Sequence, residues 1–267
     1  MTSLRVLDYA ERSGSWNMAL DEALLQSVIS GRSLPALRFY GWTPSCLSLG
    51  YFQKIRDINI SRCREEGIDI IRRPTGGRAV LHDRELTYSV VIPAPEGRSG
   101  SVLETFRLIN EGILQGLESM GVAAVFHRKE KAAGAARENP YCFAAPSQFE
   151  ILVQGRKAVG SAQMRREGVI LQHGSIPLSV DRERIGSLMS RSDRSGDGRI
   201  VQAEDLPAGL EELLGRKFEL GELVDAITKA FGGRFRCLGV QPERDELEMA
   251  LRLKEEKYET ESWTFRR

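Results

Sequence analysis

The chain has 267 residues, of which 41% are hydrophobic and 28% charged, and its formal net charge is +1. This composition is typical of a globular protein, and the charge gives no reason to expect a nucleic acid or an acidic membrane as partner. The four cysteines are scattered without a C-x-x-C pair, so neither a zinc site nor a disulfide framework is indicated, and no metal is expected. The chain shows no apolar signal segment and no run of about 18 apolar residues, so we expect a cytoplasmic location.

The first hundred residues carry mostly strand patterns, with two helical patterns among them. Ser13 or Ser15 is a suitable cap for the first helix, whose apolar residues recur at helical spacing as far as Gly31. In chain order we predict a strand over 4–7, that helix, strands over 36–42 and 46–52, a helix over 57–66, and strands over 68–72, 79–82 and 86–93.

The rest of the chain changes from strands to helices. In order we predict a helix over 102–120, a strand over 122–126, a loop over 128–140, a hairpin around 154–155, a strand over 168–177, an exposed connector over 190–198, and helices over 206–214, 220–231 and 244–256. Strands come in consecutive runs rather than alternating with helices. The pattern therefore predicts an α+β fold rather than a repeating βαβ fold.

One loop has a composition suited to ligand binding. It reads Arg72-Arg-Pro-Thr-Gly-Gly-Arg-Ala-Val-Leu-His-Asp83. Two adjacent glycines let backbone N–H groups approach a ligand, and arginines favour a phosphate or a carboxylate. The loop matches neither common nucleotide-binding glycine pattern. From these residues alone, a surface hairpin turn explains the glycine pair equally well.

A cysteine and a lysine form the second candidate pair. Cys142 follows the loop and precedes a predicted strand, and Lys157 lies near the turn of the predicted hairpin. A thiol and an amine in contact can act as nucleophile and base, because burial lowers the pKa of a lysine and a nearby cation favours the thiolate. The alternatives are a buried cysteine that packs as a small hydrophobe and a lysine that is solvated.

Two histidines stand at the ends of predicted strands in polar surroundings. His82 and His173 are candidates for a pocket wall, although a structural histidine with satisfied hydrogen bonds is an equally good interpretation. His127 has the charged neighbours of a surface residue. Three cysteines fall within strand or helix patterns and are expected to pack, namely Cys46, Cys63 and Cys237.

Four blocks together resemble the biotin/lipoate protein ligase and lipoyl-transferase superfamily. They are the loop over 72–83, then Gly155-Arg-Lys157-Ala-Val-Gly-Ser-Ala-Gln163, then Leu171-Gln-His-Gly-Ser-Ile176, and the ending Lys257-Tyr-Glu-Thr-Glu-Ser-Trp263. Their order matches the family over nearly the whole chain. The resemblance implies a central mixed sheet flanked by helices, as a catalytic domain over 1–200 with a helical C-terminal region over 201–267.

Cys142 distinguishes the branches of this superfamily. Its position before the hairpin is similar to that in octanoyltransferases of the LipM type. The resemblance then implies transfer of octanoyl from acyl carrier protein, through a Cys142 thioester, to a lysine of a lipoyl domain such as the glycine-cleavage H protein. It implies no ATP and no metal, and we expect a monomer.

The resemblance also implies roles for particular residues. Cys142 would be the nucleophile, and Lys157 would relay the proton and polarise the acyl carbonyl. The implied substrate-binding residues are Arg72, Arg73, Thr75, Gly76, Gly77, His82, Gly160, Ser161, His173 and Gly174.

Three other functions remain open at this point. An ATP-dependent lipoate-protein ligase would carry Cys142 incidentally, and an octanoyl amidotransferase would take its acyl group from another lipoyl domain. A non-catalytic binder of lipoyl domains would need neither residue. Arg78 stands where the family often has a third glycine. Its side chain could crowd an adenylate, while its charge suits phosphate, so this position does not decide between transferase and ligase.

Overall fold

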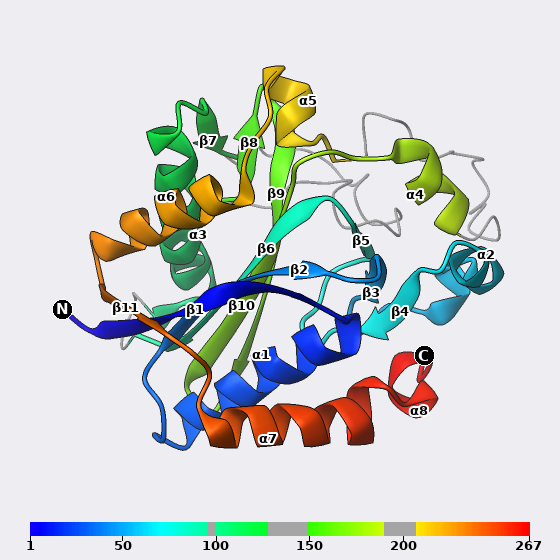
Figure 1. Cartoon of the computed structure of the whole chain (residues 1–267), viewed down its shortest axis with the longest axis horizontal. Helices are drawn as coiled ribbons and strands as arrows, with labels where there is room; N and C mark the ends of the chain where they lie inside the picture. The colour runs from blue at the N-terminus through cyan, green and yellow to red at the C-terminus, as the bar shows by residue number, and fades with distance from the viewer. Residues whose placement is uncertain (96–99, 128–148, 190–206) are drawn as a thin grey trace.

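The computed structural model describes residues 1–95, 100–127, 149–189 and 207–267, and these build a central eight-stranded sheet (Figure 1). The strand order is β11-β1-β2-β6-β10-β9-β8-β7. In chain order the strands are β1 (Ser3–Arg12), β2 (Ala36–Trp42), β6 (Glu85–Pro93), β7 (Ala124–Phe126), β8 (Ile151–Val153), β9 (Arg156–Arg166), β10 (Val169–Pro177) and β11 (Arg236–Val240). β11, β1 and β2 pair in parallel and the other neighbours pair antiparallel, so the predicted α+β class with a mixed sheet is confirmed.

A smaller sheet and several helices complete the fold. The smaller sheet has the order β4-β3-β5, formed by β3 (Cys46–Leu49), β4 (Asp69–Arg72) and β5 (Val80–His82). The helices are α1 (Gly14–Ile29), α2 (Ile60–Glu65), α3 (Val102–Ser119), α4 (Arg182–Leu188), α5 (Leu210–Leu214), α6 (Leu220–Gly232), α7 (Arg244–Leu253) and α8 (Glu261–Thr264), with short helical turns η1 (Ile55–Asp57) and η6 (Lys254–Tyr258).

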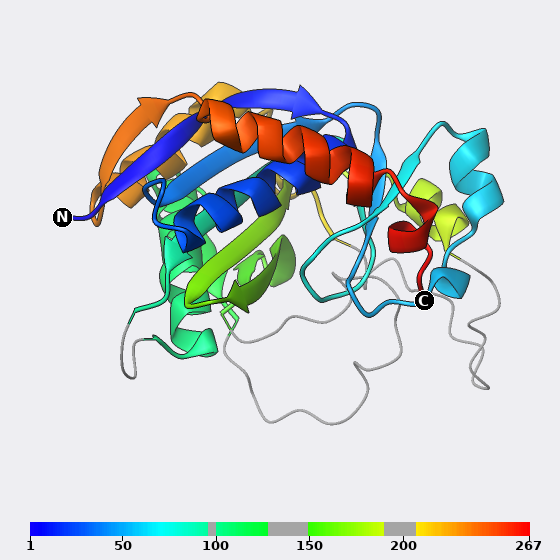
Figure 2. The ribbon, with the colours of Figure 1, turned by 90° about the horizontal axis from the view of Figure 1, so that it is seen from below.

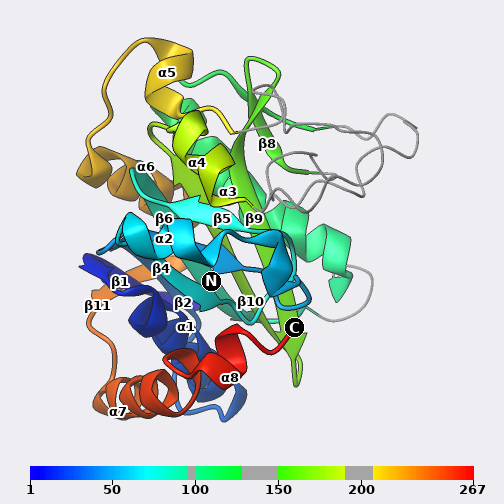
Figure 3. The ribbon, with the colours of Figure 1, turned by 90° about the vertical axis from the view of Figure 1, so that its right-hand side faces the viewer.

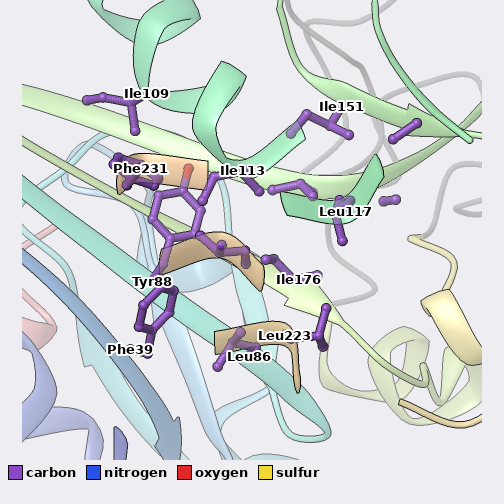
Figure 4. Packing of buried hydrophobic residues seen from close by; sticks show 14 of the residues in the cluster. Phe39, Leu86, Tyr88, Ile109, Ile113, Leu117, Ile151, Ile176, Leu223 and Phe231 are labelled. Carbon is purple, nitrogen blue, oxygen red and sulfur yellow. The ribbon is translucent and has the colours of Figure 1, made fainter. Parts of the chain in front are cut away.

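The middle strands of the large sheet bury both of their faces. Successive residues of a strand point to opposite sides, so each strand supplies two cores. Phe39 of β2 and Tyr88 of β6 pack in the core under α3 and α6, which Figure 4 shows from close by. Tyr40 and Val91 of the same strands pack in the core under α1 and α7. Any polar residue on these strands therefore lies away from water.

Helix α1 packs against the large sheet and against α7. Figure 2 shows α1 and α7 next to each other on the same side of the sheet. It begins at a predicted cap, because the Ser13 side chain accepts a hydrogen bond from the Trp16 N–H. Gly31 follows its end with a φ of +68°. Nearly all of its residues are buried, since apolar neighbours cover the helix on more than one side.

The small sheet forms a separate layer with α2 and α4, seen from its own side in Figure 3. Leu47, Cys63 and Leu188 pack in its core. The predicted glycine loop connects β4 to β5, and α8 packs beside β4. Thr75 of this loop bonds to His173 of β10, so the loop lies against a central strand of the large sheet.

The structure corrects some of the predicted elements. β11 lies between the predicted helices over 220–231 and 244–256, where no strand was predicted, and it pairs with β1 from the other end of the chain. α4 lies between the predicted strand over 168–177 and the predicted connector over 190–198, where no element was predicted. The predicted strand over 46–52 ends at Leu49. The predicted loop over 128–140, the connector over 190–198 and the domain boundary at 200 lie outside the described residues.

No helix in the described ranges combines the length and the apolar character needed to cross a bilayer.

A buried ion pair fastens α7 to the N-terminal strand. Arg5 of β1 donates to both carboxylate oxygens of Glu246, at 2.9 and 2.7 Å, and both side chains are buried. The pair thus connects a strand near the N-terminus with a helix near the C-terminus. Removing one partner would leave the other charge buried without compensation.

We therefore expect Glu246→Ala to lower the free energy of unfolding by about 3–5 kcal/mol, measured by urea denaturation at neutral pH. Glu248→Ala on the same helix is the matched control. Glu248 pairs with Arg244 at the surface, so its loss should change the free energy by less than about 0.5 kcal/mol. Equal losses in the two variants would contradict the assigned role of the buried pair.

Candidate active site

The loop between β4 and β5 folds around the side chain of Arg73. Its guanidinium donates to the carbonyl oxygens of Gly76 at 2.9 Å, Arg78 at 2.6 Å and Ser48 at 2.9 Å. Arg73 is buried, and it also lies on the wall of the cavity described below. It therefore shapes the loop and faces the site.

The glycine pair has a structural basis. Gly77 has a φ of +92°, a conformation that glycine adopts without strain. Gly50 lies against the loop so closely that a Cβ there would stand 1.8 Å from the Gly77 carbonyl oxygen. At Gly76 a Cβ would meet nothing within 4 Å, so this part of the loop is open.

Arg72, which we predicted to bind substrate, is fully buried behind the loop. It donates to the carbonyl oxygens of Gly50 and Gln53, each at 2.7 Å, and of Thr264 at 3.0 Å. Burial, helped by neighbouring arginines, lowers its pKa to about 10. The structure thus places Arg72 in the scaffold that joins the loop to α8, and not on the cavity wall.

His82 lies at the end of β5 within a polar network. Its Nδ1 is 2.7 Å from Glu85 Oε1, and its Nε2 is 2.7 Å from Ser48 Oγ. The ring stacks on Trp42 with 3.9 Å between centroids. The imidazole is therefore held from both nitrogens and one face.

Glu85 is the buried anion of this network. Its carboxylate accepts hydrogen bonds from Thr87 and, at 2.5 Å, from Ser175. Burial acts to raise the pKa of Glu85, but the charge and hydrogen bond of His82 and the two hydroxyls outweigh it, so the pKa is lowered. The buried network around His82 thus contains an ionised carboxylate.

His173 on β10 belongs to a second network. Its Nε2 is 2.6 Å from Thr75 Oγ1 and its Nδ1 is 3.3 Å from Asp21 Oδ2, while Asp21 Oδ1 accepts from Arg38 at 2.9 Å. Burial lowers the pKa of His173 although Asp21 opposes this shift. Burial also acts to raise the pKa of Asp21, but His173 and Arg38 outweigh it and lower the pKa. A neutral imidazole fits these contacts, donating from Nδ1 to Asp21 and accepting at Nε2 from Thr75.

The two networks meet at a narrow cavity of about 30 Å³ between the large and the small sheet. Met18, Tyr40, Trp42 and Val80 form apolar parts of its wall. The structure brings these predicted substrate-binding residues together on the wall: Arg73, His82, Gly160, Ser161, His173 and Gly174. Thr75 contacts the wall through its bond to His173.

The strand glycines allow close packing behind this wall. A Cβ at Gly174 would stand 2.6 Å from the Tyr88 ring and 2.8 Å from Ser161 Oγ. Gly174 pairs with Ser161 across β10 and β9, and Ser161 Oγ is 2.7 Å from the Tyr88 hydroxyl. Glycine is therefore needed at this position for packing, whatever contact it makes with substrate.

Lys157, the predicted proton relay, is buried at the start of β9. Its Nζ donates to Glu150 Oε1 at 2.7 Å, and the two side chains are only 4% and 3% exposed. A buried amine of this kind is stabilised by its carboxylate partner. Lys157 is thus desolvated, the condition that its predicted catalytic role requires, while the role itself stays a prediction.

Cys142, the predicted nucleophile, lies outside the described residues, so its contact with Lys157 stays a prediction. Cys46 and Cys63 are buried, as expected, and Cys237 is half-buried. Burial raises the pKa of Cys46 well above its usual value and that of Cys63 to about 11. Within the described part of the chain, no three His, Cys, Asp or Glu side chains are placed to hold a metal.

The sheet, the glycine loop and the cavity define the fold of a lipoate ligase. A crystal structure of lipoate-protein ligase A bound with ATP aligns over 99% of both chains with a TM-score of 0.80 and 23% identity. A putative lipoate protein ligase from T. acidophilum aligns over 100% of both chains with a TM-score of 0.78 and 23% identity. At these identities the likeness concerns the fold, and the predicted ligase-type fold is confirmed.

The chain belongs to the lipoyl protein ligase A/B catalytic-domain family, whose model matches residues 13–232. It is 40% identical to octanoyltransferase LipM of Carboxydothermus hydrogenoformans over 100% of both chains. It is 41% identical to octanoyltransferase LipM of Anoxybacillus flavithermus and 39% identical to that of Bacillus subtilis, each over 98% of both chains. The predicted resemblance to octanoyltransferases of the LipM type and the acyltransferase class are thus confirmed.

Several residues of the site were not predicted from the sequence. Asp21, Glu85, Asn110 and Glu150 are all buried and hold residues of the site in place. Three of them are acidic residues that lie within or next to apolar runs of the sequence. An acidic residue in such a run is the available signal, because a carboxylate that is buried with its apolar neighbours requires a partner.

The burial of His173 predicts a pH dependence of stability. Between its lowered pKa and about 6.5, the unfolded chain binds a proton that the folded protein does not. The free energy of unfolding should therefore have its full value above pH 6.5. It should decrease as the pH drops below that value, by up to about 1.4 kcal/mol per pH unit. Denaturation between pH 7.5 and 5 should show that His173→Gln loses this part of the slope. Identical slopes in both proteins would contradict the prediction.

Proposed function

We propose that this protein transfers an octanoyl group from acyl carrier protein, through a thioester on Cys142, to a lysine of a lipoyl domain in protein lipoylation. The observation that carries the proposal is the full-length similarity to proteins named octanoyltransferase LipM. Cys142 and the buried Lys157 supply the nucleophile and the amine that such a transfer needs.

The cavity supports an alkyl substrate. Its apolar wall residues suit a hydrocarbon chain, and the histidine networks give it a polar end. A volume of about 30 Å³ has room for little more than a water molecule or two. An octanoyl chain must therefore displace side chains, and the flexible Met18 is the wall residue best suited to move.

The first step is thioester exchange. The Cys142 sulfur attacks the octanoyl carbonyl, the new carbon–sulfur bond forms, and the carrier thiol leaves with a proton. Bond types are the same on both sides, so the exchange is nearly isoenergetic. In the second step the lysine amine of the lipoyl domain attacks, an amide forms, and the Cys142 thiol is released. Amide formation from a thioester is downhill, so the transfer needs no ATP to drive it.

Lys157 handles the proton and the charge of these steps. Held by Glu150, its amine can stabilise a thiolate or pass a proton to the leaving thiol. The open backbone at Gly76 is a candidate to donate an N–H to the oxyanion of the tetrahedral intermediate, whereas Gly174 lies in a strand that pairs on both sides.

The acceptor we propose is a lipoyl domain, such as that of the glycine-cleavage H protein. The structure of a bipartite lipoate protein ligase from Thermoplasma acidophilum, described with its E2 lipoyl domain, aligns over 99% of this chain with a TM-score of 0.79. That fold supports a lipoyl domain as the acceptor class. We place the reaction in the cytoplasm, in line with the scattered cysteines, and expect a monomer.

The deciding experiment is intact mass spectrometry after the protein is mixed with octanoyl-acyl carrier protein in the absence of ATP. We expect one octanoyl adduct that hydroxylamine removes and that Cys142→Ser lacks. Cys237→Ser is the matched control and should keep the adduct, because that half-buried thiol lies on the edge strand β11 and not on the cavity wall. Addition of a lipoyl domain should move the group to its lysine.

Other outcomes would assign a different reaction. Absence of an adduct, with lipoate transfer that appears only when ATP is added, would make the protein a ligase. Acylation by an octanoylated lipoyl domain but not by the carrier protein would make it an amidotransferase.

Lys157→Gln should slow octanoyl transfer by about 10²- to 10⁴-fold, the usual loss when a group that moves the proton is removed. Glutamine still has an N–H to donate to Glu150, so folding should survive the change. The rate of adduct formation at saturating carrier protein measures the effect. Lys229→Gln, at an exposed position of α6, should act like the wild type. A rate unchanged in Lys157→Gln would remove Lys157 from the mechanism.

A further inference from the structure

We propose that Asn110 is a positioning residue for Lys157, acting through the turn at Phe149 and the carboxylate of Glu150. The inference rests on the proposed function, because the placement of Lys157 matters only if the transfer uses its amine. Asn110 lies on α3, under the large sheet, and none of the sequence motifs contains it.

The Asn110 side chain is 1% exposed and its amide has partners on both atoms. Oδ1 accepts from Gln172 Nε2 at 2.8 Å, from the Tyr88 hydroxyl at 3.1 Å and from Ser161 Oγ at 3.3 Å. Nδ2 donates to the Phe149 carbonyl oxygen at 3.0 Å. One amide group thus connects three strands of the sheet with the turn that leads into β8.

The turn needs such an anchor because Phe149 has a φ of +66°. A non-glycine residue in this left-handed region is strained and stays there only when its surroundings hold it. The Phe149 N–H donates to the His127 carbonyl oxygen at 3.2 Å, and the ring meets Phe126 edge-on with 5.8 Å between centroids. Asn110 supplies the hydrogen bond to the remaining backbone group, the carbonyl.

Glu150 is the next residue after this strained position. Its own carbonyl accepts from the His127 N–H at 2.7 Å, and its carboxylate accepts from Lys157 Nζ at 2.7 Å. Rotation of the Phe149 peptide would move the Glu150 side chain away from the amine. Together with the two hydrogen bonds to His127, the hydrogen bond from Asn110 therefore holds the carboxylate that Lys157 contacts.

The other end of the same amide reaches the cavity. Ser161, which donates to Asn110 Oδ1, lies on the cavity wall. Asn110 thus sets the position of the predicted proton relay relative to the wall against which we place the acyl group. Displacement of a catalytic group by about 1 Å can lower a rate by as much as about 100-fold.

Asn110→Asp tests this role with a side chain of the same shape. Its second carboxyl oxygen replaces the N–H donor and faces the Phe149 carbonyl oxygen. We expect kcat for octanoyl transfer from acyl carrier protein to fall at least about tenfold, and KM to change less than about twofold. Ile113→Val, one turn further along α3 in the core, is a control for loss of stability alone and should keep kcat. If circular dichroism shows that Asn110→Asp does not fold, Asn110→Ser replaces it, because serine is too short to reach Phe149.

The double variant with Lys157→Gln shows whether Asn110 acts through the lysine. We expect the Asn110 substitution to slow the wild-type background but to cause no further loss once Lys157 is absent. An equal loss in both backgrounds, or no loss in either, would overturn the inference while leaving the Cys142 thioester intact. A Lys157→Gln protein as fast as the wild type would instead remove the role of Lys157, and this inference with it. Absence of the Cys142 adduct in the wild type tests the transferase separately.

Discussion

The structure depends on one constraint: the central strands β2, β6 and β10 are covered on both faces, so every polar side chain on them needs a protein partner. Asp21 shows how the constraint is met. Its two carboxylate oxygens accept from Arg38, Tyr40, Ser89 and His173, so that a single helical residue satisfies donors from three strands. Breaking such a network would leave a buried charge without its hydrogen-bond partners, so the network holds the side chains of the site in fixed positions.

The same constraint explains why the cavity lies between the two sheets. There the large sheet is covered by β3 and β5 together with Met18 of α1, and glycines and short polar side chains lie beside the apolar wall residues. Glu85 and Asp21 lie beneath the wall as anions, each holding one histidine. A substrate entering here meets positions that are already fixed, so little reorganisation of polar groups accompanies binding.

The sequence predicted the parts of the fold that depend on local pattern. Strand and helix periodicity located β2, β6, β10, α1 and α3, and the ordered family blocks identified the ligase-type fold. β11 escaped because five residues with little apolar alternation become a strand only by pairing with β1. Arg72 and Arg73 are neighbours in one motif and could not be distinguished by pattern. In the structure Arg73 lines the cavity, whereas Arg72 contacts the C-terminal residue Thr264. Asn110 and Glu150 escaped because their importance arises from contacts with distant strands.

Arg72 has a consequence for the order in which the molecule is completed. It bonds to Thr264, 192 residues later, and its own carbonyl accepts from the Trp263 indole at 2.8 Å. Contacts this far apart in sequence form late, because a long segment must be synthesised and ordered first. A chain that ends before residue 260 can already contain the glycine loop, yet it lacks two of the hydrogen bonds that anchor Arg72. The ligand loop therefore has its full set of hydrogen bonds only in a chain that includes the C-terminal helices, so a truncation before residue 260 would weaken a loop nearly 200 residues away.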